Sequence, residues 1–441
     1  MKACLHFFSR ACFPVLCLGL VIMMQTSTQA ATDADVGKSF SPYSTGMPTF
    51  PGLSAGLKID KDNVDRFKDA LDAGTFMMVK NGWYEIKTAP TTSFDVVPKY
   101  VEATRANLNK TRLGDKPGEI IGYAGGRPFP EEPQESDPRA GEKIAWNFRY
   151  GAGETFTIRP VQWKYRNLMS GKVERSLLVN VHALKFKYRV ETPPTPEIQP
   201  NPSNLLNATY LMVNEPMDLK NTQLLIQRYD NDLKLDDAYM YFGFQRRVRR
   251  LSTGQTTDAF LGSDTMIEDF GGYNARVSET QWKFNGTRNM LLPFYNHNEL
   301  TLSDEYKDPT GFRYVAFTGQ GGCFPDVRWQ LRKVHVVTGV PLLASHPVSR
   351  RVFLFDAQTN TIAVSLIYDR KGELWKVGLL GKTHPDYQMA SNKGAGVPID
   401  DSGTMIDVQA KRCSTGQFKS FIDPKLNPPS FFQVQQLRSG D

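Results

Sequence analysis

After residue 155 the chain alternates hydrophobic and polar residues with a period of two, the pattern of strands that bury one face. In the first run, for example, Trp163 and Tyr165 alternate with Gln162 and Lys164. Sequences rich in Asp, Asn and Gly separate several of the runs. We therefore predict one large antiparallel sheet, with strands at 155–165, 183–190, 209–213, 224–228, 238–251, 351–355, 361–368 and 373–377.

Two short stretches before residue 110 have the pattern of a helix. One is 63–73, which we expect to end at Gly74, and the other begins at Pro98. The segment 31–59 is rich in Ser, Pro and Gly and is predicted to be an extended arm. Residues 60–441 contain no Gly/Ser linker, so we expect them to form a single domain with loop insertions, mainly β with some α.

Residues 1–30 have the three parts of a secretory signal. The first ten residues contain two cations and no acid, an apolar run of 14 residues follows at 11–24, and small residues precede the end at Ala30. As a helix, that run would cover about 21 Å, short of the ~30 Å hydrocarbon core of a bilayer. We therefore expect cleavage near Ala30 and export of the mature chain.

The cysteines and the charge narrow the class of protein. Only Cys323 and Cys413 lie outside the predicted signal, and in an oxidising compartment they predict one disulfide, with a pair of buried free thiols as the alternative. A formal net charge of +7 over 441 residues is too dilute for a dedicated nucleic-acid-binding protein. The hydrophobic fraction of 40% excludes wholesale disorder.

No motif predicts catalysis or metal binding. The sequence GLSAG at 52–56 matches the nucleophile elbow of α/β-hydrolases, but the preceding PTFP is incompatible with the core strand that this turn must follow. The histidines lack ligand spacing, and His182 and His335 are interpreted as structural. We expect no catalytic residue, no metal and no cofactor.

The densest basic cluster lies in the run 238–251. If that run is one strand, Arg246 and Arg250 share a face, which makes them candidates for binding an anionic head group or an acidic partner surface. The alternative, which we favour, is that the arginines pair with nearby acids such as Asp264, Glu268 and Asp269.

Long runs of the chain resemble a known family. They include 238–277, 290–296 and 350–377, and the stretch 63–107 is similar to the same family. The family consists of large exported proteins of Gram-negative bacteria, labelled outer-membrane lipoprotein-sorting-protein-like, with no assigned biochemical function. The resemblance implies a fold similar to LolA and LolB, a strongly curved antiparallel sheet or half-open barrel plugged by helices. It also implies a periplasmic location and a pathway shared with resistance-nodulation-division transporters and outer-membrane components.

Such a fold suggests a carrier of a lipid or another hydrophobic compound, without covalent chemistry. A curved sheet offers a concave face on which aromatic side chains can hold an acyl chain. The alternative is an envelope interaction protein whose interior is filled by its own side chains, and an enzyme acting on lipid or glycan ranks third. The candidate ligand-binding residues on the concave face are Trp163, Tyr165, Phe186, Tyr188, Tyr239 and Tyr241.

Overall fold

A computed structural model describes residues 30–251 and 256–438. The predicted signal, apart from Ala30, lies outside the described residues. Within the described part of the chain, no helix is both long and apolar enough to cross a membrane.

One large sheet dominates the structure, as the alternating pattern predicts. Its strands follow the order β1-β2-β17-β18-β19-β20-β21-β22-β5-β6-β7-β8-β9-β10, with β11 paired to β17 and β12 to β20. All neighbours are antiparallel except β2 with β17 and β12 with β20. The bounds are β1 Lys58–Ile59, β2 Ile86–Ala89, β5 Thr155–Asn167, β6 Val173–Lys185, β7 Leu205–Glu215, β8 Gln223–Tyr229, β9 Asp237–Phe242, β10 Arg247–Arg250, β11 Thr280–Leu292, β12 Phe294–Tyr295, β17 Arg328–Pro341, β18 Val348–Asp356, β19 Ile362–Asp369, β20 Leu374–Thr383, β21 Ile399–Asp407 and β22 Arg412–Phe421.

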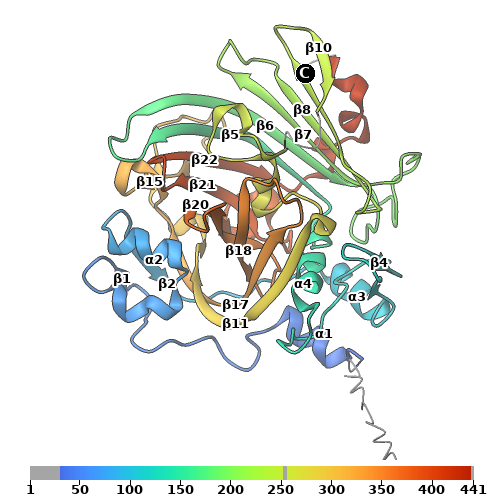
Figure 1. Cartoon of the computed structure of the whole chain (residues 1–441), viewed down its shortest axis with the longest axis horizontal. Coiled ribbons are helices and arrows are strands. Elements are labelled where there is room, and N and C mark those ends of the chain that lie inside the picture. The colour runs from blue at the N-terminus through green and yellow to red at the C-terminus, as the bar shows by residue number, and fades with distance from the viewer. Residues whose placement is uncertain (1–29, 252–255, 439–441) are drawn as a thin grey trace, which may run out of the picture. The chain divides into compact units, whose positions relative to one another are not determined.

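The sheet is strongly curved, and its long strands bend round a common interior (Figure 1). Its terminal strands β1 and β10 do not pair with each other, so the curve stays open. This confirms the predicted large, curved antiparallel sheet. Three small two-stranded pairs lie outside it: β3 Arg112–Leu113 with β4 Ile120–Ile121, β13 Leu302–Ser303 with β14 Tyr314–Val315, and β15 Phe317–Thr318 with β16 Phe324–Pro325.

Two predicted strands are wrong in their extent. The run 238–251 is a hairpin of β9 and β10, because the chain reverses at Arg246, which has a φ of +50° and donates its backbone N–H to the carbonyl of Phe242. The run 183–190 continues β6 only to Lys185. Beyond it the backbone turns at Tyr188, with a φ of +58°. Alternation alone cannot detect such a reversal in a polar turn.

The helices are short and lie mostly before the sheet strands in the sequence. They are α1 Asp33–Phe40, α2 Ala73–Lys80, α3 Pro98–Ala106 and α4 Ala140–Arg149. The helix predicted at Pro98 is confirmed. The helix predicted at 63–73 is instead a 3-10 helix η1, Val64–Ala70, and the Asp72 side chain accepts a hydrogen bond from the N–H of Thr75 and thereby starts α2 around Gly74.

The arm expected at 31–59 is not extended throughout, because α1 lies within it. Thr32 and Asp35 form a reciprocal capping box that satisfies the free N–H groups at the start of this helix. Val36 and Phe40 of α1 pack with Tyr100 of α3 and are buried. The N-terminal segment is therefore tied to the body through a small apolar cluster.

Candidate ligand cavity

The floor of the candidate site is a part of the sheet where two glycines stand opposite each other. Gly403 of β21 pairs with Gly416 of β22, and Gly416 pairs with Trp163 of β5. A Cβ at Gly416 would lie 2.5 Å from the Phe418 ring, and one at Gly403 would lie 3.1 Å from it. The missing side chains therefore leave room for the ring of Phe418, which lines the cavity beside the two glycines.

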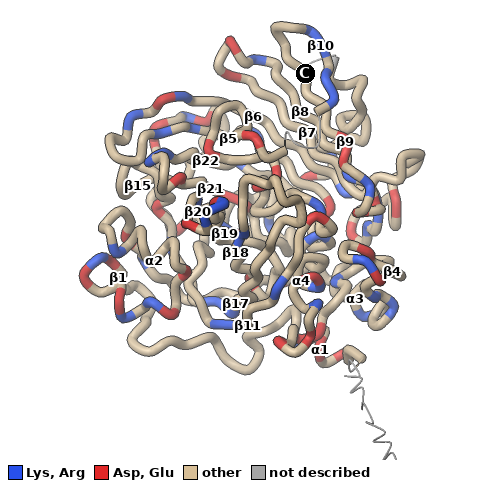
Figure 2. The backbone as a smooth tube through the Cα atoms, viewed as in Figure 1, with Lys and Arg blue, Asp and Glu red and all other residues tan. Residues whose placement is uncertain are grey.

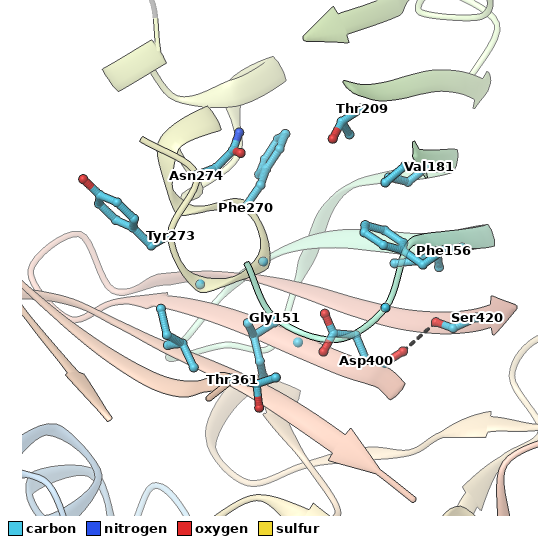
Figure 3. A pocket seen from close by; sticks show the side chains of 18 of the residues that line it. Gly151, Phe156, Val181, Thr209, Phe270, Tyr273, Asn274, Thr361, Asp400 and Ser420 are labelled. Atoms are coloured by element: carbon cyan, nitrogen blue, oxygen red, sulfur yellow. Dashed lines mark hydrogen bonds between the residues drawn. The ribbon is translucent and has the colours of Figure 1, made fainter. Parts of the chain in front are cut away.

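Above this floor is a cavity of about 490 Å³ (Figure 3). It lies against the inner faces of β5 to β8 and β19 to β22, and the C-terminal end of α4 and the segment 265–274 also line it. Apolar side chains dominate its wall. They include Ile158, Val161, Trp163, Val179, Val181, Leu211, Leu224, Ile226, Phe270, Leu379, Met405 and Phe418.

Residues 256–279, here called the cover, pack over the cavity with three short 3-10 turns. These turns are η3 Phe260–Gly262, η4 Ile267–Gly272 and η5 Val277–Glu279. Phe260 and Phe270 of the cover are 5.3 Å apart between ring centroids, and both contact the ring of Trp163 on β5. This aromatic cluster closes the cavity on the side of β5.

Buried polar contacts fasten the cover to the sheet. The carboxylates of Glu268 and Asp269 both contact the guanidinium of Arg351 on β18, at 3.0 Å for Asp269. Asp264 and Ser414 of β22 exchange two hydrogen bonds of 2.8 Å, from the Asp264 N–H and from the Ser414 hydroxyl. Burial raises the pKa of Asp264, and the Ser414 hydrogen bond opposes this shift. The cover is thus held by charges that water does not screen.

The cations that line the cavity fall into two groups, and the acids Glu154, Asp269 and Asp400 line it as well. Arg228 pairs with Asp236 and Lys382 with Asp400. In contrast, Arg127, Arg149 and Lys185 have no carboxylate within 4.0 Å among the described residues. Their hydrogen bonds are mainly to carbonyls, as in the 2.9 Å hydrogen bond from Lys185 Nζ to the Gly151 carbonyl.

The amine of Lys185 is largely shielded from water. Burial lowers the pKa of Lys185, and the nearby Glu191 and Glu154 oppose this shift. Glu154 itself accepts backbone hydrogen bonds from Glu191 and Thr192, at 2.8 and 3.0 Å, and lies 3.4 Å from Arg189. The cavity therefore has an apolar body with unpaired cations at part of its wall.

The six predicted aromatic residues are not brought together. Only Trp163 lines the cavity. Tyr165 is buried in the same apolar cluster but donates its hydroxyl to the Leu261 carbonyl. Tyr188 packs edge-on against Tyr123 and Tyr150 and does not line the cavity.

Three of the six residues lie on the opposite face of the sheet. Phe186, Tyr239 and Tyr241 belong to a cluster with Phe432 and Leu437 of the C-terminal segment. The register explains the placement of the two tyrosines. Leu224 and Ile226 of β8 line the cavity, and their partners in β9 are Met240 and Ala238. Tyr239 and Tyr241 alternate with these partners, so they point to the other face. The placement of these three on the concave face was wrong. Whether any of the six aromatic residues binds a ligand stays a prediction.

The arginine cluster is not paired as favoured from the sequence. Arg250 contacts Asp237 of β9, and Arg246 lies in the turn of the hairpin. The proposed acidic partners lie in the cover, where Glu268 and Asp269 contact Arg351 and Asp264 contacts Ser414. Arg246 and Arg250 also do not share one strand face, because only Arg250 is in β10.

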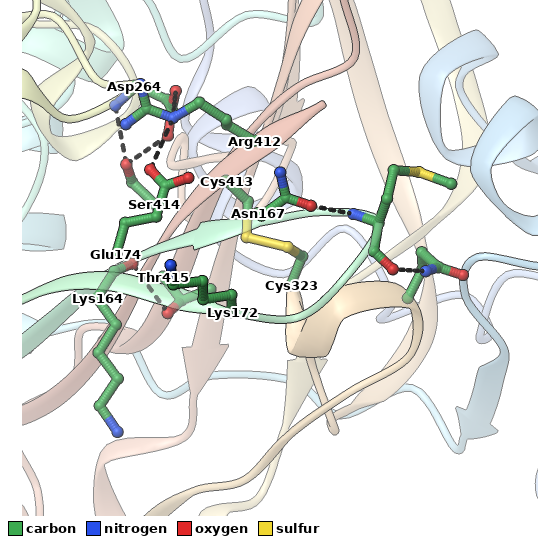
Figure 4. The surroundings of a disulfide bond; sticks show 12 residues. Lys164, Asn167, Lys172, Glu174, Asp264, Cys323, Arg412, Cys413, Ser414 and Thr415 are labelled. Atoms are coloured by element: carbon green, nitrogen blue, oxygen red, sulfur yellow. Dashed lines mark hydrogen bonds and ion pairs between the residues drawn. A yellow bond between two sulfur atoms is a disulfide. The ribbon is translucent and has the colours of Figure 1, made fainter. Parts of the chain in front are cut away.

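The predicted disulfide between Cys323 and Cys413 is confirmed (Figure 4). Both cysteines are fully buried, and the bond joins the segment after η7 Gln320–Gly322 to β22 beside the β5–β6 turn. His182 and His335 are buried beside Asn427 and Thr287, respectively. Ser54 of the GLSAG motif precedes a turn, and its carbonyl accepts a hydrogen bond from the N–H of Leu57. In the part of the chain that the structure describes, no group of three His, Cys, Asp or Glu side chains is arranged to hold a metal ion.

Sequence reasoning missed the parts that shape the cavity. In the sequence, the cover is noticed only as part of the longer family resemblance. Its run DTMIEDF carries a signal, because it places acids among apolar residues. The structure explains two of these acids, since Glu268 and Asp269 are buried against Arg351. Gly403 and Gly416 were also missed. A glycine inside a strand pattern indicates a close approach of another group, which here is Phe418.

The fold and the cavity define an open, curved-sheet protein with an apolar space on its inner face. Residues 58–438 match the family described as "Protein of unknown function (DUF1329)", and the chain belongs to this family. This confirms the family indicated by the sequence.

Individual relatives are distant. An uncharacterized protein of Pseudomonas aeruginosa is 27% identical over 366 residues, which cover 80% of this chain and 73% of the relative. A domain from Vibrio parahaemolyticus, named as an outer membrane lipoprotein-sorting protein, is similar with a TM-score of 0.47 and 14% identity over 68% of this chain and 100% of that one. A LolA superfamily protein from Nitrosomonas europaea is similar with a TM-score of 0.36 and 10% sequence identity, over 64% of this chain and 91% of that one.

Proposed function

We propose that this protein is an exported binding protein that carries a lipid or another hydrophobic compound in the cavity, without covalent chemistry. The observation that supports the proposal is the apolar cavity of about 490 Å³ between the sheet and the cover. This volume lies within the roughly 300–1,000 Å³ of small-molecule sites. The alternative of an adaptor with a filled interior is disfavoured by the same observation.

The energetics suit a carrier. Each buried methylene contributes ~0.8 kcal/mol, so an acyl chain with about ten methylenes in the cavity gains about 8 kcal/mol before the cost of ordering it. That gain is in the range needed for reversible binding. The unpaired cations Arg127, Arg149 and Lys185 at the wall favour an amphiphile with an anionic head group.

The location and the partners belong to the same proposal. The predicted signal at 1–30 and the family resemblance support a periplasmic location. The resemblance also suggests that the carrier works with a transporter of the resistance-nodulation-division class and with outer-membrane components.

The test uses native protein and a fluorescent fatty acid. Organic extraction followed by mass spectrometry should find an amphiphile in stoichiometric amount, and the emptied protein should bind the fluorescent probe saturably. Val181→Trp, which places a large ring in the cavity, should weaken probe binding at least tenfold by filling space.

A matched control is available on the same strand. Ser176 lies in β6 at an exposed position on the opposite face, so Ser176→Trp should leave probe binding unchanged. Absence of both a native amphiphile and saturable probe binding would contradict the proposal. Equal effects of the two substitutions would show that the probe binds elsewhere.

A further inference from the structure

Two turns at the open edge of the sheet expose large apolar side chains beside each other. Met217, in the β7–β8 turn, is 81% exposed, and Phe244, in the β9–β10 turn, is 70% exposed. These are the two highest values among the large hydrophobic residues that the structure describes. The turns are in contact, since a Cβ at Gly243 would lie 2.6 Å from the carbonyl oxygen of Lys220.

The same edge carries an excess of positive charge. Residues 215–221 and 243–250 contain four arginines and Lys220 against Glu215 and Asp218. Asp218 contacts Arg175 and Arg250 contacts Asp237. Within the described residues, no ion pair involves the exposed Arg246, Arg247 and Arg249. Figure 2 shows Lys and Arg positions in blue at β10.

Protection of a sheet edge does not account for this composition. Arginines on an edge strand such as β10 hinder pairing with another chain. That role needs no exposed Phe244 or Met217, which increase the tendency to associate. A surface that combines an aromatic tip with unpaired cations matches the boundary between the hydrocarbon and the anionic head groups of a membrane.

Apolar side chains continue from this edge to the cavity. The ring of Phe244 is 5.8 Å from that of Phe242 between centroids. Phe242 and Leu219 pack against the buried cluster that contains Leu211 and Leu224, and these two residues line the cavity. The exposed tips are therefore the outer end of the apolar layer that forms the cavity wall.

We propose that these two turns and β10, here called the docking edge, bind the surface of an anionic phospholipid membrane. Met217 and Phe244 enter the interfacial layer, and Arg246, Arg247 and Arg249 contact lipid phosphates. The partner is a lipid surface rather than a protein, because the arginines lie along one exposed strand and turn, beside two exposed apolar side chains. This proposal does not rest on the carrier function, since docking requires no ligand in the cavity.

Flotation of the full-length mature chain with vesicles tests the docking edge. We expect binding to vesicles of phosphatidylglycerol and phosphatidylethanolamine, weaker binding to phosphatidylcholine, and loss of binding at high salt. The triple variant Arg246→Gln/Arg247→Gln/Arg249→Gln should weaken partitioning on the order of a hundredfold. The variant Met217→Ser/Phe244→Ser should weaken it roughly tenfold or more.

Matched variants at other sites distinguish binding through the docking edge from non-specific binding to vesicles. Lys61→Gln/Lys371→Gln/Lys393→Gln removes three exposed cations outside the docking edge. Leu342→Ser/Leu343→Ser removes two exposed apolar side chains outside it. Both should bind vesicles like the unchanged protein. Failure of the unchanged protein to float with anionic vesicles would overturn the proposal, as would equal losses in the matched variants. Vesicle binding by a protein that takes up no fatty acid would leave docking intact and contradict only the carrier function.

Discussion

Replacing His335 by a side chain that does not titrate should remove a large part of the loss of stability in acid. His335 lies in β17, is 6% exposed, and has its Nδ1 2.9 Å from the Thr287 hydroxyl. Burial lowers the pKa of His335 to about 4, only partly opposed by the Glu132 carboxylate. In the unfolded chain, the pKa of a histidine is about 6.5.

The direction and the size of the stability change with pH follow from these two pKa values. Between about pH 6.5 and pH 4 the unfolded chain binds a proton that the folded chain does not, so stability falls as the pH falls. The slope approaches ~1.36 kcal/mol per pH unit, which gives a loss of about 2.5 kcal/mol at about pH 4.5 relative to neutral pH. This loss should be absent in His335→Gln.

Urea unfolding at about pH 7.5 and about pH 4.5 measures the difference. The decrease in unfolding free energy on acidification should be about 2.5 kcal/mol smaller in His335→Gln than in the unchanged protein. Thr287→Val keeps the buried imidazole and should keep the full pH dependence. If His335→Gln and the unchanged protein lose the same free energy, the imidazole is not held neutral by burial and the reasoning fails.

Two further predictions concern the disulfide and the cover. The variant Cys323→Ala/Cys413→Ala opens a loop with a sequence separation of 90 residues, and the chain-entropy relation gives a loss of up to about 4.6 kcal/mol in urea unfolding; a loss below about 1 kcal/mol would show that the bond constrains the unfolded chain little. Arg351→Met removes the cation that the buried carboxylates of Glu268 and Asp269 share, leaves Glu268 with its contact to His346, and should cost about 3–5 kcal/mol, with earlier proteolytic cleavage within 256–279. Its control, Arg350→Met, changes a cation that stacks on Tyr368 and should cost about 1 kcal/mol or less, so similar proteolysis of both variants would contradict this role of Arg351.

The sheet was predictable because most of its strands carry their own local signal. The meander of β18, β19 and β20 shows this, since polar turn residues separate three apolar runs that the structure places side by side. The single disulfide was predictable for a similar reason, because only two cysteines lie outside the predicted signal. The decisive information lies in the local pattern of each strand for the sheet, and in the number of cysteines for the disulfide.

The faces of the strands were not predictable in the same way. Alternation separates Tyr239 and Tyr241 from Ala238 and Met240, but it does not say which set faces the interior of a curved sheet. Both faces of β9 are covered here, one by the cavity cluster and the other by Phe432 and its neighbours. Because both sets are buried, aromatic character was a poor guide, and on β9 the side of the cavity cluster instead carries Ala238 and Met240.

The cavity depends on contacts that no local pattern contains. Ser414 meets Asp264 across 150 residues of sequence, and Arg351 meets Glu268 across 83. These contacts hold the cover in place, while the paired Gly403 and Gly416 leave room for the Phe418 ring in the wall of the cavity. Since each contribution is a relation between distant segments, removing Arg351 should loosen the cover and leave the sheet formed. On the proposed carrier function, a ligand would enter and leave by movement of the cover, because the strands around it are fixed by their hydrogen-bonded neighbours.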